Sequence, residues 1–438
     1  MLFMNAIFNF LIKVDNFFWA YIAFILIALL GIGLTIQSNF YQVRILPKVF
    51  KTFFSFLDKK QTSSRGTHPL RAFFASVGGM IGIGNIVGIV TAVQLGGPGA
   101  LFWVWNAALI GTIIKYSEIF LGLTHRITNS SGGYDGGPMY FLAKAFKSRW
   151  IPILISILLC IYGVEIYQFV VITDSITANF SINRYIVIAV LLFFILYASS
   201  GGVPRIGKIC STVMPVFMIL YVALCSWIIF SNISIVPAIF KVVISSAFTG
   251  HAAVGGFAGA TVLLSVQYGL SKAAYSADIG IGYDSIIQSE SSVVQPEKQA
   301  QLAILGVCLD NLICTMSILV ALVSGLWKAE GVEASYLIQA ALSQYFPYMN
   351  LFMPIFIFIV GYSTMISYFC VGIKCATFLN PKYGKKIFMV YGAIALVFFS
   401  FFDQTSAFLV VSLVQAMLLI INLIGIYLLR KQISFVLN

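Results

Sequence analysis

The chain has 438 residues, of which 60% are hydrophobic and only 9% are charged, and its formal net charge is +12. A soluble domain carries about 25% charged residues, so this composition excludes an ordinary soluble enzyme or binding domain. Apolar runs of about 20 residues recur along the chain, as expected for transmembrane helices and not for a membrane β-barrel. We therefore expect an all-α polytopic membrane protein.

Eleven apolar segments are predicted to be transmembrane spans. The first is expected to be a retained span and not a cleaved signal peptide, because it is long and basic residues follow it. In chain order the predicted spans are 17–37, 71–94, 100–124, 150–177, 184–199, 209–230, 252–271, 300–326, 349–373, 386–401 and 406–429.

The basic residues indicate how these spans are oriented. With eleven spans and the N-terminus outside, the inward-facing loops and the C-terminal tail carry 21 of the 26 Lys and Arg, and the outward-facing regions carry four. This bias is the positive-inside pattern of membrane proteins. The positive charge therefore reflects membrane orientation, and we expect membrane lipid and no nucleic acid as a partner. We predict a bacterial cytoplasmic (inner) membrane protein with its N-terminus outside and its C-terminus inside.

Two of the predicted spans are rich in glycine, which is a poor helix former. Span 71–94 contains Gly78, Gly79, Gly82, Gly84 and Gly88, and span 252–271 contains Gly255, Gly256, Gly259 and Gly269. Paired glycine-interrupted spans in two halves of a chain point to a transporter binding site. The alternative is that these glycines only allow close helix packing, since Gly84 and Gly88 fit the GxxxG pattern.

The positions of these spans predict an internal repeat. Once the first span is set aside, ten remain, and a glycine-rich span opens each set of five. Because five is odd, the second set starts from the opposite face of the membrane, which gives a 5+5 inverted repeat. The predicted regions are an extra helix with a basic loop (1–70), a first repeat (71–230) and a second repeat with the tail (231–438).

A broken helix in mid-membrane has a physical use. Its unpaired backbone groups cost several kcal/mol each unless something satisfies them. The free N–H groups at the start of a half-helix suit a carboxylate, and the free carbonyl groups suit Na⁺.

Ionisable residues inside predicted spans are candidates for function. Lys115 and Glu118 are three residues apart on one helix and are expected to pair, with a structural or gating role. Glu165 lies close to Gln168 in sequence and is a candidate proton or cation site, whereas Asp310 is expected to pack helices or form a gate.

The stretch GIGNIVGIVTAVQLGGPGALFWVW (82–105) closely resembles the alanine or glycine:cation symporter family. These are sodium-coupled amino-acid carriers of the LeuT-type fold, in the amino acid–polyamine–cation superfamily. The resemblance covers roughly residues 70–380. Further matches are KYSE (115–118), DGGPMYFL (135–142), GGVPRIGKI (201–209), MPVFMILYV (214–222), AFTGHAAVGGFAGA (247–260), PEKQ (296–299), LDNLIC (309–314) and YSTMISYFCVG (362–372).

The resemblance implies which residues bind substrate. Asn85 is expected to hold cation and substrate, Gln168 to face the substrate, and Phe257 to form an apolar wall or lid. The alternative for the two amides is a structural hydrogen bond to backbone or to a neighbouring helix. The full expected substrate set is Gly82, Ile83, Gly84, Asn85, Gln168, Gly256, Phe257 and Gly259.

The resemblance also implies a Na⁺ site, because a hard cation needs oxygen ligands. Its expected residues are Gly79, Gly82, Ser363 and Thr364. The alternative for the two hydroxyl residues is a bond to the preceding turn of their own helix.

The chain departs from the family pattern at two places. Ile83 stands where the family has threonine, and we expect this to affect which substrate is accepted. Ala277, Asp278 and Ile279 replace the family's Asn-Glu-Ala, which bears on the expected inner gate and on coupling.

The sequence therefore predicts a Na⁺-coupled symporter that imports a small neutral amino acid, alanine or glycine by resemblance, and not an enzyme. One alternative is a proton-coupled permease of the same fold, with Glu165 or Asp278 as the proton carrier. Another is a membrane enzyme, or a scaffold that has lost transport. The oligomeric state stays open.

Overall fold

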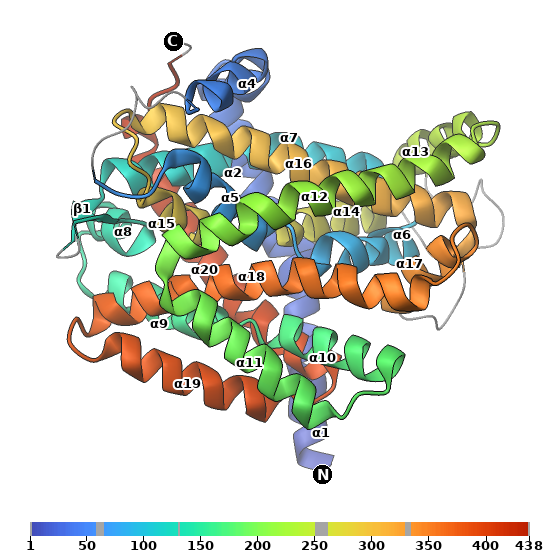
Figure 1. Ribbon diagram of the computed structural model, residues 1–438. Helices are drawn as coiled ribbons and strands as arrows, with labels where there is room; N and C mark the ends of the chain where they lie inside the picture. Colours follow the sequence, from blue (N-terminus) through green and yellow to red (C-terminus); the bar gives the residue numbers. More distant parts are fainter. Residues whose placement is uncertain (1, 58–64, 130–131, 250–261, 329–333, 437–438) are drawn as a thin grey trace.

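The computed structural model describes residues 2–57, 65–129, 132–249, 262–328 and 334–436. The described chain is almost entirely helical (Figure 1), which confirms the predicted all-α class. Its strands are β1 (Ile127–Thr128) and β2 (Tyr134–Asp135), which pair antiparallel in a short hairpin.

The first half of the chain begins with a long helix made of α1 (Leu2–Phe17), a π-helical segment η1 (Phe18–Ala23) and α2 (Phe24–Gln37). The helices that follow are α3 (Tyr41–Arg44), α4 (Leu46–Ser55), α5 (Pro69–Met80), π-helical η3 (Gly84–Gly88), α6 (Val90–Gly96), α7 (Ala100–Thr124), α8 (Pro138–Phe146), α9 (Trp150–Tyr162), α10 (Ile166–Phe180), α11 (Arg184–Ser200) and α12 (Gly202–Ser231).

The second half contains two long, largely buried helices, α16 and α18, and several shorter ones. Its helices are α13 (Val236–Thr249), α14 (Val262–Ser276), α15 (Tyr283–Ser289), α16 (Pro296–Ser324), η5 (Leu326–Lys328), α17 (Ala334–Ser343), α18 (Met349–Leu379), α19 (Gly384–Phe399), α20 (Gln404–Leu429) and η6 (Arg430–Gln432).

Seven helices among the described residues are long and apolar enough to cross a membrane, or eight if the bent pair α5–α6 counts as one span. A crossing helix needs about 20 residues, and α14 and α19 are shorter, with 15 and 16 residues. The predicted total of eleven spans and the inverted repeat therefore stay predictions.

The outer helices expose apolar side chains, as expected for a protein surrounded by lipid. Phe193 on α11, Ile219 on α12 and Ile394 on α19 are each about two-thirds exposed, at 64%, 69% and 65%. The polar and charged core lies inside, where α5, α7, α16 and α18 pack with the short helix α15.

One predicted boundary is wrong. The sequence was expected to form an inward-facing loop over 272–299, but α14 continues to Ser276 and α15 is a buried helix. The segment between them, 277–282, is buried as well. Glycine at 280 and 282, both with positive φ, lets the chain turn there without leaving the core.

Candidate functional site

The predicted break in the first glycine-rich span is present. Helix α5 ends at Met80, Ile81 is extended, and the following half-helix is bent by 49°. The backbone N–H of Gly82 donates a hydrogen bond of 2.9 Å to Asn85 Oδ1. The Asn85 side chain thus replaces the helical partner that the break removes from Gly82.

Asn85 is buried and is tied to α16. Its Nδ2 donates to Asp310 Oδ1 and to Cys314 Sγ, the latter at 3.3 Å. Ser317 Oγ donates to the Asn85 carbonyl oxygen at 2.8 Å. The site therefore contains a fixed amide whose orientation is set by a neighbouring carboxylate.

Gln168 lies on α10, just after a second break at 163–165. Its Oε1 accepts a hydrogen bond of 3.4 Å from the backbone N–H of Ile83. A methyl group on Gly82 would lie 3.1 Å from Gln168 Nε2 and 2.7 Å from Thr364 Oγ1. Glycine at 82 is therefore required by the close approach of these two polar groups.

The two predicted hydroxyl ligands have different surroundings. Thr364 Oγ1 donates to its own helix at Val360 O, 3.0 Å, and lies 3.4 Å from the Gly78 carbonyl oxygen. Ser363 Oγ instead contacts Val360 O at 2.8 Å and Met214 Sδ at 3.3 Å. Only Thr364 of this pair lines the central cavity.

A third break brings in residues that were not expected at the substrate site. Between α14 and α15 the chain unwinds over 277–282, and Tyr275, Ser276 and Asp278 line the same cavity as Asn85. The sequence holds a signal for this break, because Ile-Gly-Ile-Gly occurs both at 81–84 and at 279–282.

Lys115 holds the third break in place. Its Nζ donates to the Asp278 carbonyl oxygen at 2.7 Å and forms an ion pair with Asp284. Ser76 on α5 donates to the same Asp284 carboxylate. The expected pairing of Lys115 with Glu118 is wrong in the described structure: Glu118 Oε2 accepts from Asn422 Nδ2 at 3.0 Å, and a closer carboxylate takes the lysine.

The second break supplies another carboxylate. Glu165 has a left-handed backbone (φ +54°) between α9 and α10, and it lines the cavity beside Gln168. Three residues earlier, Tyr162 hydroxyl donates to Asp278 Oδ1 at 3.3 Å. Both carboxylates that the sequence offered as proton carriers, Glu165 and Asp278, therefore face one space.

The central cavity is small. It has room of about 20 Å³ for the centre of a water-sized molecule, close to what one water needs. Of the predicted residues it is lined by Gly79, Gly82, Gly84, Asn85, Gln168 and Thr364. Ile83 is buried beside Gly361 without lining it, and Gly256, Phe257 and Gly259 lie outside the described residues.

The family model of sodium:alanine symporters matches residues 4–438. The chain belongs to the sodium:alanine symporter family. An uncharacterised transporter, YflA, of Bacillus subtilis is 31% identical over 96% of this chain and 91% of its own length. The sodium/alanine symporter AgcS of Methanococcus maripaludis is 28% identical over 95% of this chain and 93% of its own length.

Solved structures agree on the fold. The crystal structure of MhsT in complex with L-phenylalanine is 15% identical, covers 85% of this chain and 90% of that one, and has a TM-score of 0.57. This likeness supports the LeuT-type fold alone. As a sodium:alanine symporter family member, the chain is a multi-pass membrane transporter and not an enzyme.

Proposed function

We propose that the chain is a Na⁺-coupled symporter that carries a small neutral amino acid, alanine or glycine, into the cell by alternating access. The observation that carries this proposal is the meeting of three helix breaks around one polar cavity. The cavity presents two amides, several hydroxyl groups, two carboxyl groups and backbone polar groups, which suit an amino acid and an alkali cation.

The substrate would lie against the first break, where Gly82 leaves space beside Asn85 and Gln168. Amides bind the ammonium and carboxylate groups of an amino acid without adding a net charge to the core. Ile83 has an apolar side chain without a hydroxyl group, so selectivity would come from Gln168 and from the residues predicted from the sequence alone, Gly256, Phe257 and Gly259.

The Na⁺ site would use Thr364 Oγ1 together with backbone oxygen atoms of the first break, near Gly79 and Gly82. Thr364 Oγ1 already lies within 3.4 Å of the Gly78 carbonyl oxygen, so two oxygen atoms converge there. Ser363 would join only if its hydroxyl turned away from Met214.

The cavity must enlarge before it can hold an amino acid, because its present volume suits one water molecule. Na⁺ and substrate would drive this change by binding the open form more tightly than the closed form. We further propose the eleven-span, 5+5 arrangement with boundaries 1–70, 71–230 and 231–438, in a bacterial cytoplasmic membrane with the N-terminus outside. Broken segments from both halves meeting at one cavity support it.

The test is uptake of radiolabelled alanine into proteoliposomes, with and without an inward Na⁺ gradient. Accumulation that requires Na⁺ is the expected result, and competition by glycine and larger amino acids would define the substrate range. No alanine uptake under either a Na⁺ gradient or a proton gradient would contradict the proposal and would indicate a family member that has lost transport.

A proton-coupled permease is the second candidate, because Glu165 and Asp278 both line the cavity. Uptake in Na⁺-free buffer with an acidic exterior would support it. Uptake that stops in Na⁺-free buffer at every pH would exclude it.

A further inference from the structure

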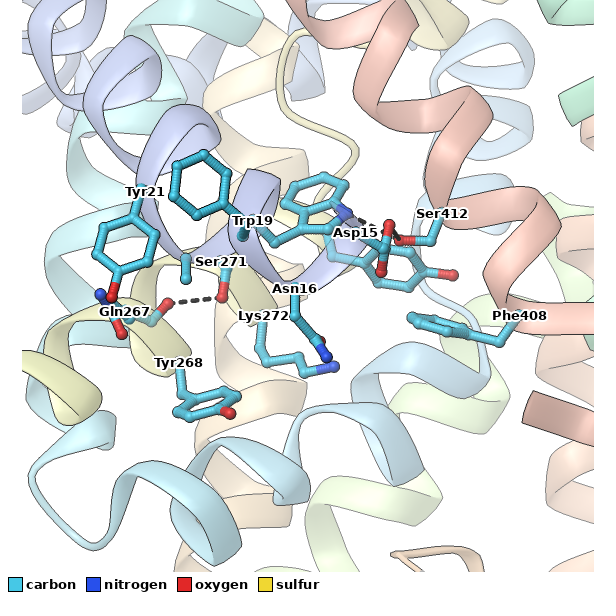
Figure 2. Close-up of a pocket in the computed structure, with 13 residues that line it drawn as sticks. Asp15, Asn16, Trp19, Tyr21, Gln267, Tyr268, Ser271, Lys272, Phe408 and Ser412 are labelled. Carbon is cyan, nitrogen blue, oxygen red and sulfur yellow. Dashed lines mark hydrogen bonds between the residues drawn. The ribbon is translucent and has the colours of Figure 1, made fainter. Parts of the chain in front are cut away.

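A second and larger pocket lies outside the central cavity, between the N-terminal helix, α14 and α20 (Figure 2). Its volume is about 260 Å³, against about 20 Å³ for the central cavity. We call it the peripheral pocket. Tyr275 lines both spaces, so the two are neighbours.

One wall of the peripheral pocket carries a fixed carboxylate. Asp15 is 6% exposed, and its Oδ1 accepts a hydrogen bond of 2.7 Å from Ser412 Oγ. Ser412 Oγ in turn accepts one of 2.8 Å from Trp19 Nε1. A carboxylate inside an apolar span is costly, so it indicates a functional partner. None of the ion pairs found among the described residues involves Asp15.

The positive charge of the peripheral pocket belongs to Lys272 on α14. Lys272 extends beside Phe408, with Nζ 5.4 Å from the ring centroid, and Asp15 lies by Ser412 on the neighbouring wall (Figure 2). In the part of the chain that the structure describes, Lys272 Nζ has no hydrogen-bond or ion-pair partner. The two opposite charges thus line one pocket without forming a direct ion pair with each other.

A buried amide adds a further unused donor. Gln267 is 4% exposed and lines the pocket, and its Nε2 has no hydrogen-bond partner among the described residues. Burying such a donor without a partner destabilises the protein, so an acceptor supplied by a ligand would stabilise it.

Aromatic rings complete the walls. The Tyr275 ring lies edge-on to Trp19 at 6.2 Å and against Phe408 at 5.3 Å. Aromatic faces attract ammonium groups and also accommodate apolar side chains.

We propose that the peripheral pocket is a second ligand site, which binds a zwitterion carrying an ammonium group and an anionic group. The ammonium group binds at Asp15 and the aromatic rings, and the anionic group binds at Lys272. A free amino acid has this chemistry, and so does a phosphatidylethanolamine headgroup. The site is distinct from the proposed substrate site and touches it through Tyr275, whose ring would lie 3.7 Å from a methyl group on Gly84.

The experiment measures binding to the full chain in a background that lacks the central site. Gly82→Ala fills the central cavity, because its methyl group would meet Thr364 and Gln168. In detergent free of zwitterionic lipid, radiolabelled L-phenylalanine is titrated against Gly82→Ala alone and combined with Asp15→Asn or Lys272→Met. We expect one saturable site per chain in the background and at least tenfold weaker binding in both combinations.

Matched controls separate binding from folding. Asp15→Asn keeps an acceptor for Ser412. Lys272→Met removes the charge with an unbranched side chain that is one atom shorter. Lys241→Met, at an exposed lysine on α13, should leave binding unchanged. Thermal unfolding of each variant checks that the chain remains folded.

A second arm tests the lipid source by native mass spectrometry after reconstitution with phosphatidylethanolamine or phosphatidylglycerol. One retained phosphatidylethanolamine that both variants lose would support the site with the headgroup as its ligand. Equal retention of phosphatidylglycerol, which has no ammonium group, would overturn the zwitterion assignment. If neither Asp15→Asn nor Lys272→Met weakens the binding of L-phenylalanine or of lipid, the proposed site is overturned.

Discussion

The sequence Ile-Gly-Ile-Gly occurs at the first break, over 81–84, and within the third break, over 279–282, but the two breaks have different surroundings. Neutral groups contact the first break: Asn85 and Gln168 bond its backbone, and Thr364 bonds the last turn of α5 before it. Charged groups surround the third, where Lys115 bonds the Asp278 carbonyl oxygen and pairs with Asp284.

This difference separates two roles for a broken helix. Weak, neutral bonds at the first break are easily exchanged for bonds to a ligand, so this break suits the substrate. The buried ion pair at the third break is held by the protein's own groups, and removing one partner would be costly. The third break is therefore fixed by the protein's own charged groups, next to the proposed substrate site.

The largest expected effect comes from breaking the buried ion pair at the third break. Lys115→Met leaves the buried Asp284 without its cation and should destabilise the protein by about 3–5 kcal/mol. Thermal denaturation of the protein in detergent measures this loss of stability. The double variant Lys115→Met, Asp284→Asn should recover most of the loss, and a fully stable single variant would show that the ion pair does not hold the third break.

The next largest effect is expected at the first break. Gly82→Ala should reduce alanine uptake at least tenfold, which is about 1.4 kcal/mol, because the methyl group would occupy space between Thr364 and Gln168. Proteoliposome uptake measures it. Gly88→Ala is the matched control, since a methyl group there would meet no atom within 4 Å. Equal uptake by both variants would remove the first break from the substrate site.

A smaller effect is expected at the hydroxyl pair Ser363 and Thr364 on α18. Thr364→Val should raise the Na⁺ concentration for half-maximal uptake by about tenfold, or about 1.4 kcal/mol, because one oxygen ligand is lost. Ser363→Ala should change it little, since Ser363 Oγ faces Met214. A larger effect at Ser363 than at Thr364 would reverse this assignment.

The smallest effect is expected at the second break. Glu165→Gln should leave Na⁺-driven uptake within about twofold at neutral pH, a change of less than 1 kcal/mol, if Na⁺ is the coupling ion. Uptake driven by Na⁺ and by a proton gradient is compared in the same vesicles. Loss of uptake in this variant would instead identify Glu165 as the carrier of the coupling ion.

Local chemistry explains what could be predicted. The break at Gly82 was predictable because glycine clusters weaken a helix wherever they occur. Gln168 and Thr364 were reached through a family resemblance and do line the cavity with Asn85. The break at 277–282 was missed because its charges resembled a loop, although the repeated Ile-Gly-Ile-Gly was available as a signal.

The sequence by itself determined the all-helical membrane class, the family and the break at Gly82, because hydrophobicity and backbone freedom are properties of short segments. Only the tertiary structure decided which carboxylate takes Lys115, which hydroxyl faces the cavity, and that Asp15 and Lys272 share a pocket. Lys115 pairs with Asp284, far away in sequence, and not with Glu118 on its own helix. Contacts of this kind depend on how helices pack in three dimensions, which no local pattern records.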